Sequence, residues 1–227
     1  KLLKKHVKWD PQGVASKVNY AGFQQDRALL KEYLDGVSAV SQTEFNRWDK
    51  AARLAFLINA YNAYTIQFIL SDYPDIRSIK DLGSIFSSPW SKELFPLFGI
   101  KRSLDHIEHQ IIRAPGAYDD PRIHSAVVCA SIGCPGIRNE AFTGNQLEQQ
   151  LEDSLRRFLS DRSRNRYNAR NETLEVSKIF DWYGDDFGSG FRGHASLAAF
   201  LGDYSNLLTD SPADRNKISQ QKVKIDF

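Results

Sequence analysis

Cysteine and net charge are both scarce in this sequence, and each scarcity excludes a class of protein. The two cysteines, Cys129 and Cys134, are too few and too close together to staple distant parts of a fold or to supply the four ligands of a structural zinc site. The 30 basic and 28 acidic side chains leave a formal net charge of +2, so we expect no nucleic-acid partner. Neither a glycine-rich phosphate-binding loop nor a serine elbow is present.

Long apolar runs are also missing. The segment that comes nearest to one, 54–70, is uncharged but contains polar residues, among them Asn59 and Asn62, and is too short and too polar to cross a membrane. It predicts a buried core helix. Because no repeat and no low-complexity linker divides the chain, we expect a single globular domain over residues 1–227.

Hydrophobic spacing predicts more helix than strand. Helical periodicity, capping residues and terminating prolines or glycines predict helices over 20–37, 49–71, 103–113 and 143–159. Short β-branched or alternating runs predict strands at 123–130, 173–176 and 222–227. The sequence therefore predicts an α+β fold that is mostly helical with a small sheet.

The predicted helix 103–113 carries an acidic residue on its apolar side. At about 100° per residue, Glu108 falls inside the apolar arc and should point into the protein. A buried carboxylate needs a partner, and Arg122 is an obvious candidate, so a structural role is as open as a functional one. Asp105 and His109 lie at the edge of the arc, one turn apart, where they can touch.

A second group of reactive residues follows in the chain. In a regular strand over 123–130, His124 and Cys129 would face opposite sides. A cysteine–histidine pair must therefore join different elements, for example Cys129 with His109, or Cys134 with His124. Such a pair is the usual way to generate a nucleophilic thiolate. Two other interpretations of each cysteine are open: it is a small buried hydrophobic residue, or it is half of a local disulfide in an oxidising compartment.

Two amides interrupt the apolar helix. Asn59 and Asn62 are one turn apart, and amides in a core have to be hydrogen-bonded. They either fix loops against the helix or contact a substrate.

Three motifs in this order resemble the family catalogued as domain of unknown function 547. They are Asn59-Ala-Tyr-Asn62, Ser103-Leu-Asp-His-Ile-Glu108-His109 and Asp120-Pro-Arg122-Ile-His124-Ser-Ala-Val-Val-Cys129, and the later segment 178–187 also fits. The resemblance spans about 18–187. It implies motif positions for Glu108, His109, Arg122, His124 and Cys129, but no settled activity. Because the family occurs in exported bacterial proteins, it also implies a periplasmic or secreted location.

The leading hypothesis is a cysteine-dependent hydrolase or acyltransferase, with a fold loosely like that of papain or transglutaminase domains. Cys129 would be the nucleophile, His109 the general base with His124 as the alternative, and Glu108 the group that orients the imidazole. The substrate would be an amide or thioester in a small molecule or peptide. No cofactor and no metal are expected.

Three further residues, Arg122, Asn59 and Asn62, are predicted to bind the substrate.

Two other hypotheses remain open at this point. In the first, the domain is a non-catalytic binding or scaffold module, and Glu108, Arg122, His109 and His124 form a buried polar network. In the second, His109, His124, Glu108 and Cys129 bind a metal ion. The sequence does not predict the oligomeric state.

Overall fold

Helices make up most of the chain, and the computed structural model describes residues 1–84, 87–131 and 133–227. The α-helices are α1 (Leu2–His6), α2 (Tyr20–Gln25), α3 (Arg27–Ala39), α4 (Gln42–Arg47), α5 (Lys50–Asp72), α6 (Leu147–Ser160), α7 (Ile179–Trp182), α8 (Gly184–Phe187), α9 (Leu197–Asp203), α10 (Ser205–Leu208) and α11 (Pro212–Ser219). Short 3-10 turns are η1 (Ile79–Leu82), η2 (Pro89–Ser91), η4 (Pro121–Ser125), η5 (Gly144–Gln146) and η6 (Phe191–Gly193), and η3 (His106–Ile112) is a π-helix.

In the part of the chain that the structure describes, the strands form three small sheets. They are β1 (Val7–Trp9), β2 (Ser16–Val18), β3 (Phe95–Leu97), β4 (Ile100–Arg102), β5 (Arg166–Asn168), β6 (Thr173–Glu175) and β7 (Lys224–Asp226). β1 pairs with β2 and β3 with β4, both antiparallel, while β6 lies between antiparallel β5 and parallel β7. The predicted mostly helical α+β class is confirmed, as are the predicted strands near 173–176 and 222–227.

Helix α5 is the central element, as its apolar sequence predicts. Asp49 caps it by accepting a hydrogen bond of 2.7 Å from the backbone N–H of Ala52. From Leu54 to Leu70 nearly every side chain is buried, because other elements pack around the whole circumference of the helix. Among the helices of the described residues, none is long and apolar enough to cross a membrane.

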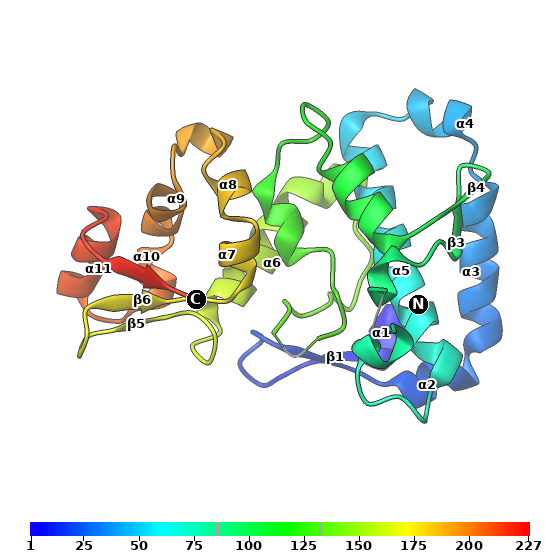
Figure 1. Cartoon of the computed structure of the whole chain (residues 1–227), viewed down its shortest axis with the longest axis horizontal. Helices are drawn as coiled ribbons and strands as arrows, with labels where there is room; N and C mark the ends of the chain where they lie inside the picture. Colours follow the sequence, from blue (N-terminus) through cyan, green and yellow to red (C-terminus); the bar gives the residue numbers. More distant parts are fainter. Residues whose placement is uncertain (85–86, 132) are drawn as a thin grey trace.

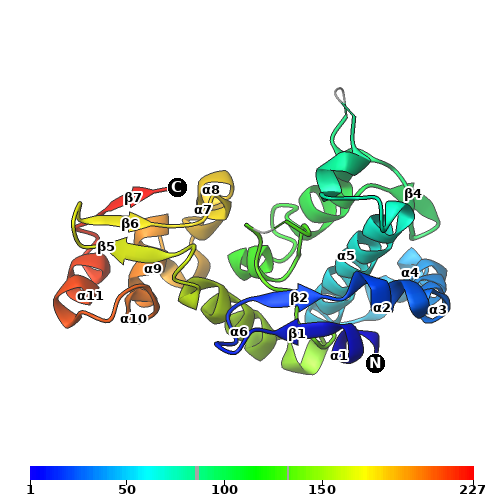
Figure 2. The same ribbon diagram turned by 90° about the horizontal axis from the view of Figure 1, so that it is seen from below.

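Two hydrophobic cores meet along helix α6. Leu147 and Leu151 of α6 belong to a core that runs from Val7 and includes α5, and Leu155 and Phe158 belong to a second core that continues to α11. Figure 1 shows α6 between the α3–α5 side and the α9–α11 side, and Figure 2 shows it running from one to the other. The expectation of a single domain stays a prediction, and α6 is the element that joins the two parts.

The predicted helix 20–37 is two helices. The chain leaves helical geometry at Asp26, where φ is −94° and ψ is 20°, and α2 and α3 flank this residue. The Asp26 carboxylate is bonded to the imidazole of His6 at 2.6 Å and to Lys5 at 2.7 Å. These two contacts hold the junction between α2 and α3 against α1.

The predicted strand 123–130 is wrong. The segment begins with the 3-10 turn η4 and continues without strand pairing. Asn62 explains the difference, because its amide nitrogen donates to the carbonyl of Ala126 and its amide oxygen accepts from the N–H of Val128, at 2.8 and 2.9 Å. The backbone groups that a neighbouring strand would use are bonded to a side chain of α5.

The predicted helix 103–113 has an unusual hydrogen-bond pattern. Ser103 caps it as predicted, accepting a hydrogen bond of 3.0 Å from the N–H of His106. The following turns are wider than an α-helix, and the N–H of Arg113 donates to the carbonyl of Glu108 five residues earlier. Such π-helical turns are rare and are often found at functional sites.

Candidate functional site

A cavity of about 690 Å³ gathers residues from two parts of the chain. From residues 61–129 it is lined by Tyr61, Trp90, Asp105, Glu108, His109, His124, Val127 and Cys129, and from residues 176–183 by Val176, Ser177, Ile179, Trp182 and Tyr183, among others. All four residues predicted to be catalytic line this one cavity.

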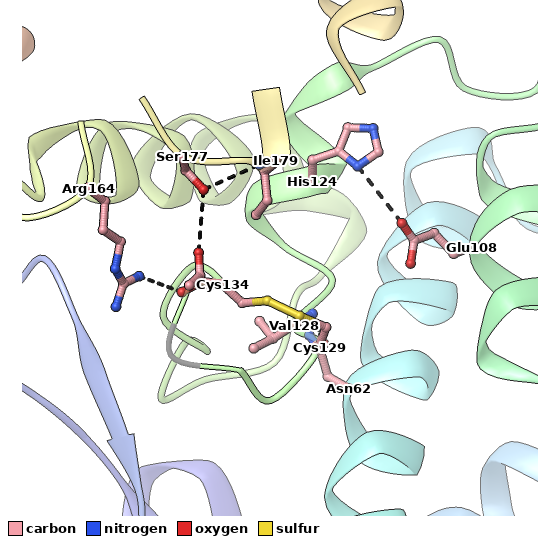
Figure 3. Close-up of a disulfide and its surroundings, with 10 residues drawn as sticks. Asn62, Glu108, His124, Val128, Cys129, Cys134, Arg164, Ser177 and Ile179 are labelled. Atoms are coloured by element: carbon pink, nitrogen blue, oxygen red, sulfur yellow. Dashed lines mark hydrogen bonds and ion pairs between the residues drawn. A yellow bond between two sulfur atoms is a disulfide. The ribbon is translucent and has the colours of Figure 1, made fainter. Parts of the chain in front are cut away.

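The two cysteines form a disulfide on the wall of the cavity. Cys129 is bonded to Cys134, and the chain has no free cysteine. The guanidinium of Arg164 donates a hydrogen bond of 2.5 Å to the carbonyl of Cys134, which holds the end of the loop (Figure 3). Because a disulfide sulfur is not a thiolate, the nucleophilic role predicted for Cys129 requires the reduced form of the protein.

The imidazole of His124 lies between two carboxylates and is only 2 % exposed. Its Nε2 donates to Asp186 at 2.8 Å, and its Nδ1 lies 3.9 Å from an oxygen of Glu108, without a hydrogen bond (Figure 3). Since an ionised carboxylate only accepts, Asp186 fixes the proton of the neutral ring on Nε2. The ring is stacked on Tyr183 at 3.9 Å between centroids, and burial lowers the pKa of His124.

Asp186 in turn holds Arg113. The guanidinium donates two hydrogen bonds to this carboxylate, of 2.7 Å from Nε and 2.9 Å from Nη2. Burial alone would raise the pKa of the Asp186 carboxyl, but the hydrogen bonds from His124 and Arg113 outweigh it and hold the pKa well below its ordinary value. Asp186 is therefore a fixed negative charge that orients two cationic or polar neighbours.

The contacts of His109 change the role that the sequence suggested for it. The Nη1 group of Arg113 is 2.8 Å from Nδ1 of His109. A guanidinium can only donate, so Nδ1 accepts and the proton of the neutral imidazole lies on Nε2. In this arrangement His109 is a hydrogen-bond donor, whereas a general base would need the lone pair of Nε2 to be free.

Glu108 points into the protein as predicted and is 7 % exposed. Its surroundings are His124 and the hydroxyl groups of Tyr61 and Tyr183. Burial first, and then the charge and hydrogen bonding of Glu108, raise the pKa of both tyrosines well above the ordinary value. Both phenols therefore remain protonated and are available as donors to the carboxylate.

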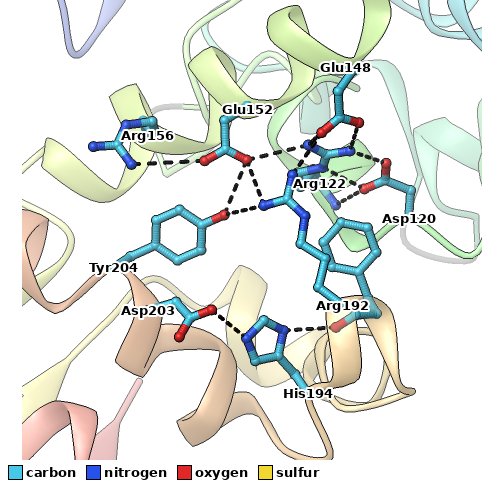
Figure 4. A network of polar contacts seen from close by, with 10 residues as sticks. Asp120, Arg122, Glu148, Glu152, Arg156, Arg192, His194, Asp203 and Tyr204 are labelled. Carbon is cyan, nitrogen blue, oxygen red and sulfur yellow. Dashed lines mark hydrogen bonds and ion pairs between the residues drawn. The ribbon is translucent and has the colours of Figure 1, made fainter.

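The predicted pairing of Glu108 with Arg122 is wrong. Arg122 is 2 % exposed and bonds instead to Asp120 and Glu148, at 2.7 and 2.6 Å from Nη2. Arg192 binds the same Glu148 at 2.7 Å, so this second network, shown in Figure 4, connects α6 to the η6 turn. The guanidinium of Arg122 is engaged by this network, and the predicted role of Arg122 in substrate binding stays without support.

Each of the two asparagines of α5 hydrogen-bonds to a carbonyl and an N–H group of a distant backbone segment. Asn59 donates to the carbonyl of Phe142 at 2.8 Å and accepts from its N–H at 2.9 Å, in the same way as Asn62 holds residues 126–128. These contacts support the interpretation that the two amides fix loops against the helix. Both amide groups are already bonded to backbone groups. Their predicted contact with a substrate stays a prediction.

The metal-binding hypothesis is not supported. Over residues 1–84, 87–131 and 133–227, no group of three or more histidine, cysteine, aspartate or glutamate side chains is arranged to hold a metal ion. His109, His124, Glu108 and Cys129 share a cavity wall without forming such a group.

Sequence reasoning missed four residues of the site: Tyr61, Arg113, Tyr183 and Asp186. Tyr61 and Arg113 lie within or beside the quoted motifs, and Tyr183 and Asp186 lie in segment 178–187, which carried part of the family resemblance. A signal for them was present. Their contacts could not be assigned, because periodicity does not say which distant segment faces η3.

Comparison with known proteins identifies a family and nothing beyond it. Residues 45–159 match the family model described as "Protein of unknown function, DUF547". The curated proteins and the solved structures contain no significant match. The likeness to papain and transglutaminase domains therefore stays a prediction.

Proposed function

The chain belongs to the DUF547 family of proteins of unknown function, and we propose that it is a cysteine-dependent hydrolase or acyltransferase. Its substrate is an amide or thioester, and the reduced form is the active one. The observation that carries the proposal is the shared cavity, which brings Cys129 together with the neighbouring residues Glu108 and His109 of η3. A pocket of this size suits a small molecule or a short part of a peptide.

The chemistry begins with reduction of the disulfide by a dithiol, which is itself oxidised to a disulfide and leaves both cysteines as thiols. The Cys129 thiol loses its proton to solvent, and the thiolate attacks the carbonyl carbon of the substrate. The bond from this carbon to nitrogen or sulfur breaks, the leaving group takes a proton from water, and a thioester forms. Water, or an acceptor amine or alcohol, then displaces Cys129 and regenerates the thiol.

His109 supports these steps as a donor. With its Nδ1 accepting from Arg113, the neutral imidazole presents Nε2–H to charge that develops in the cavity, either on the thiolate or on the carbonyl oxygen. A neutral histidine in this role is an established way to polarise a carbonyl. Asp186 holds Arg113 against His109 and also holds His124 beside Glu108, so the contribution of these residues is to position the groups.

The proposed location is the periplasm or the extracellular space. The Cys129–Cys134 disulfide supports it, because such bonds persist in oxidising compartments and are rare in reducing ones. In such a compartment, activity depends on a dithiol reductant.

A thiol-reactive acyl probe tests the proposal. The probe should label the wild-type protein after reduction and not before, and Cys134→Ala, which leaves Cys129 unpaired, should be labelled without reduction. Cys129→Ala is the matched control, since it frees Cys134 in the same loop, and its labelling should fall to the level of the unfolded protein. Labelling of Cys129→Ala as fast as Cys134→Ala would rule out Cys129 as the nucleophile.

The second candidate is a non-catalytic binding domain. One observation favours it: a chain of contacts runs from the buried side chains of Glu108 and His124 through Asp186 to Arg113, and the disulfide leaves no free thiol. Arg122 is not part of this chain. The same experiment separates the two candidates, because a binding domain gives no acyl transfer in the reduced form while still binding its ligand.

A further inference from the structure

One of the four tryptophans of the chain is exposed at the edge of the cavity. Trp182 ends helix α7, is 65 % exposed and lines the cavity of about 690 Å³. Soluble proteins bury most of their tryptophans on average. A large exposed aromatic on the wall of a cavity is therefore a surface that a ligand can cover.

Aromatic and aliphatic side chains from the same part of the chain line the cavity together with Trp182. Tyr183 follows it in the chain, lies on the same cavity wall, and is held in place by stacking on His124. Val176 and Ile179, from the segment just before, line the cavity beside them. These residues come from segment 176–183, whereas His109 and Cys129 come from earlier in the chain.

We propose that Trp182 selects substrates whose acyl part carries an aromatic ring, so that the ring stacks on Trp182 when the carbonyl reaches Cys129. The class of substrate is then an amide or thioester with an aromatic side chain next to the reacting carbonyl, as in a peptide with phenylalanine or tyrosine at that position. The reaction of the carbonyl at Cys129 rests on the proposed function. The binding of the aromatic ring rests only on the residues of the cavity wall.

A sugar ring is the competing ligand for an exposed tryptophan. Sugar hydroxyl groups need hydrogen-bond partners around the ring, and a buried hydroxyl without a partner is costly. Val176 and Ile179 offer none and pack well against the edge of an aromatic ring, but Ser177 and Lys178 line the same cavity, so the sugar is an outcome that the titration decides. Aromatic pairs also gain from offset or edge-on contact beyond the area that they bury.

The test measures binding and does not require catalysis. Oxidised wild-type protein, Trp182→Ala and Trp182→Phe are titrated by calorimetry with N-acetylphenylalanine amide, N-acetylalanine amide and N-acetylglucosamine. Ile100→Ala is the matched control, because Ile100 on β4 is 58 % exposed and lies away from the residues that line the cavity. Thermal unfolding of each variant verifies that it folds.

We expect the wild type and Ile100→Ala to bind the phenylalanine amide about tenfold more tightly than the alanine amide. Trp182→Ala should lose this preference to within about twofold, and Trp182→Phe should keep most of it. Equal binding of the two amides by the wild type, no binding of either, a preference that survives in Trp182→Ala, or tighter binding of the sugar overturns the inference. Loss of acyl transfer with the binding preference intact overturns only the proposed function.

Discussion

Replacing Asp186 by asparagine should destabilise the protein by about 3 kcal/mol. The carboxylate accepts two hydrogen bonds from Arg113 and one from His124, all between 2.7 and 2.9 Å. The amide of asparagine has one oxygen, so at least one guanidinium N–H is left facing an NH₂ group. Hydrogen bonds to charged groups contribute about 1.5–3 kcal/mol each, and partial exposure of this pair places the total loss at about 2–4 kcal/mol. For a chain of this size, about 3 kcal/mol lowers Tm by about 6–12 °C.

Urea unfolding followed by circular dichroism measures this change. The matched control is Asp181→Asn, five positions earlier, whose carboxylate lies 3.7 Å from Lys178 in an exposed pair. Exposed pairs contribute about 0–1 kcal/mol, so the control should change stability by less than about 1 kcal/mol. If Asp186→Asn costs no more than the control, Asp186 is not the group that organises Arg113 and His124, and the assignment of the His109 proton loses its support.

Two further predictions concern positions outside the cavity chemistry. Asn62→Ala should lower the free energy of unfolding in urea by about 2–4 kcal/mol, because it leaves the carbonyl of Ala126 and the N–H of Val128 without their partner. A loss below about 1 kcal/mol would show that these two hydrogen bonds do not hold the segment in place. Hydrogen bonding to Arg122 is the main cause that lowers the pKa of Glu148 from 4.5 to about 2. Since the unfolded state takes up the proton first, this contribution to stability is present above pH 4.5 and is lost as the pH falls towards 2. Glu148→Gln should flatten the decline in Tm across that window, and an unchanged slope would contradict the prediction.

The parts of the fold that follow local rules were predictable. The uncharged, apolar composition of 54–70 predicts a buried helix, and α5 is one because its whole circumference is packed. The serine at the start of the 103–113 helix is a cap, and the inward direction of Glu108 follows from rotation about the helix axis. These inferences need only neighbours within one or two turns.

Contacts between distant segments were not predictable in the same way. The β-branched run around Ile123 has strand propensity, but Asn62, about sixty residues earlier in the chain, binds the backbone groups that strand pairing would use. Likewise the partner of His124 is Asp186, on a short helix of the second core. A helix of four residues gives little periodic signal, so its position against η3 depends on packing that a single sequence does not reveal.

The disulfide shows a third kind of limit. Both readings of Cys129, a thiolate nucleophile and half of a local disulfide, are consistent with the residue pattern, and the choice depends on the redox state of the compartment. The structure contains the oxidised form.

The most direct test of the account compares how fast Cys129 is acylated in folded and in urea-unfolded Cys134→Ala. The variant removes the disulfide and leaves one thiol, so acylation by an activated ester at a single pH, located at Cys129 by peptide mass spectrometry, reports on this sulfur alone. If the cavity activates Cys129, the folded protein should react at least about tenfold faster than the unfolded chain, because preorganised donors stabilise the transition state. Equal rates, or a faster reaction in urea, would show that the fold conceals this thiol and does not activate it.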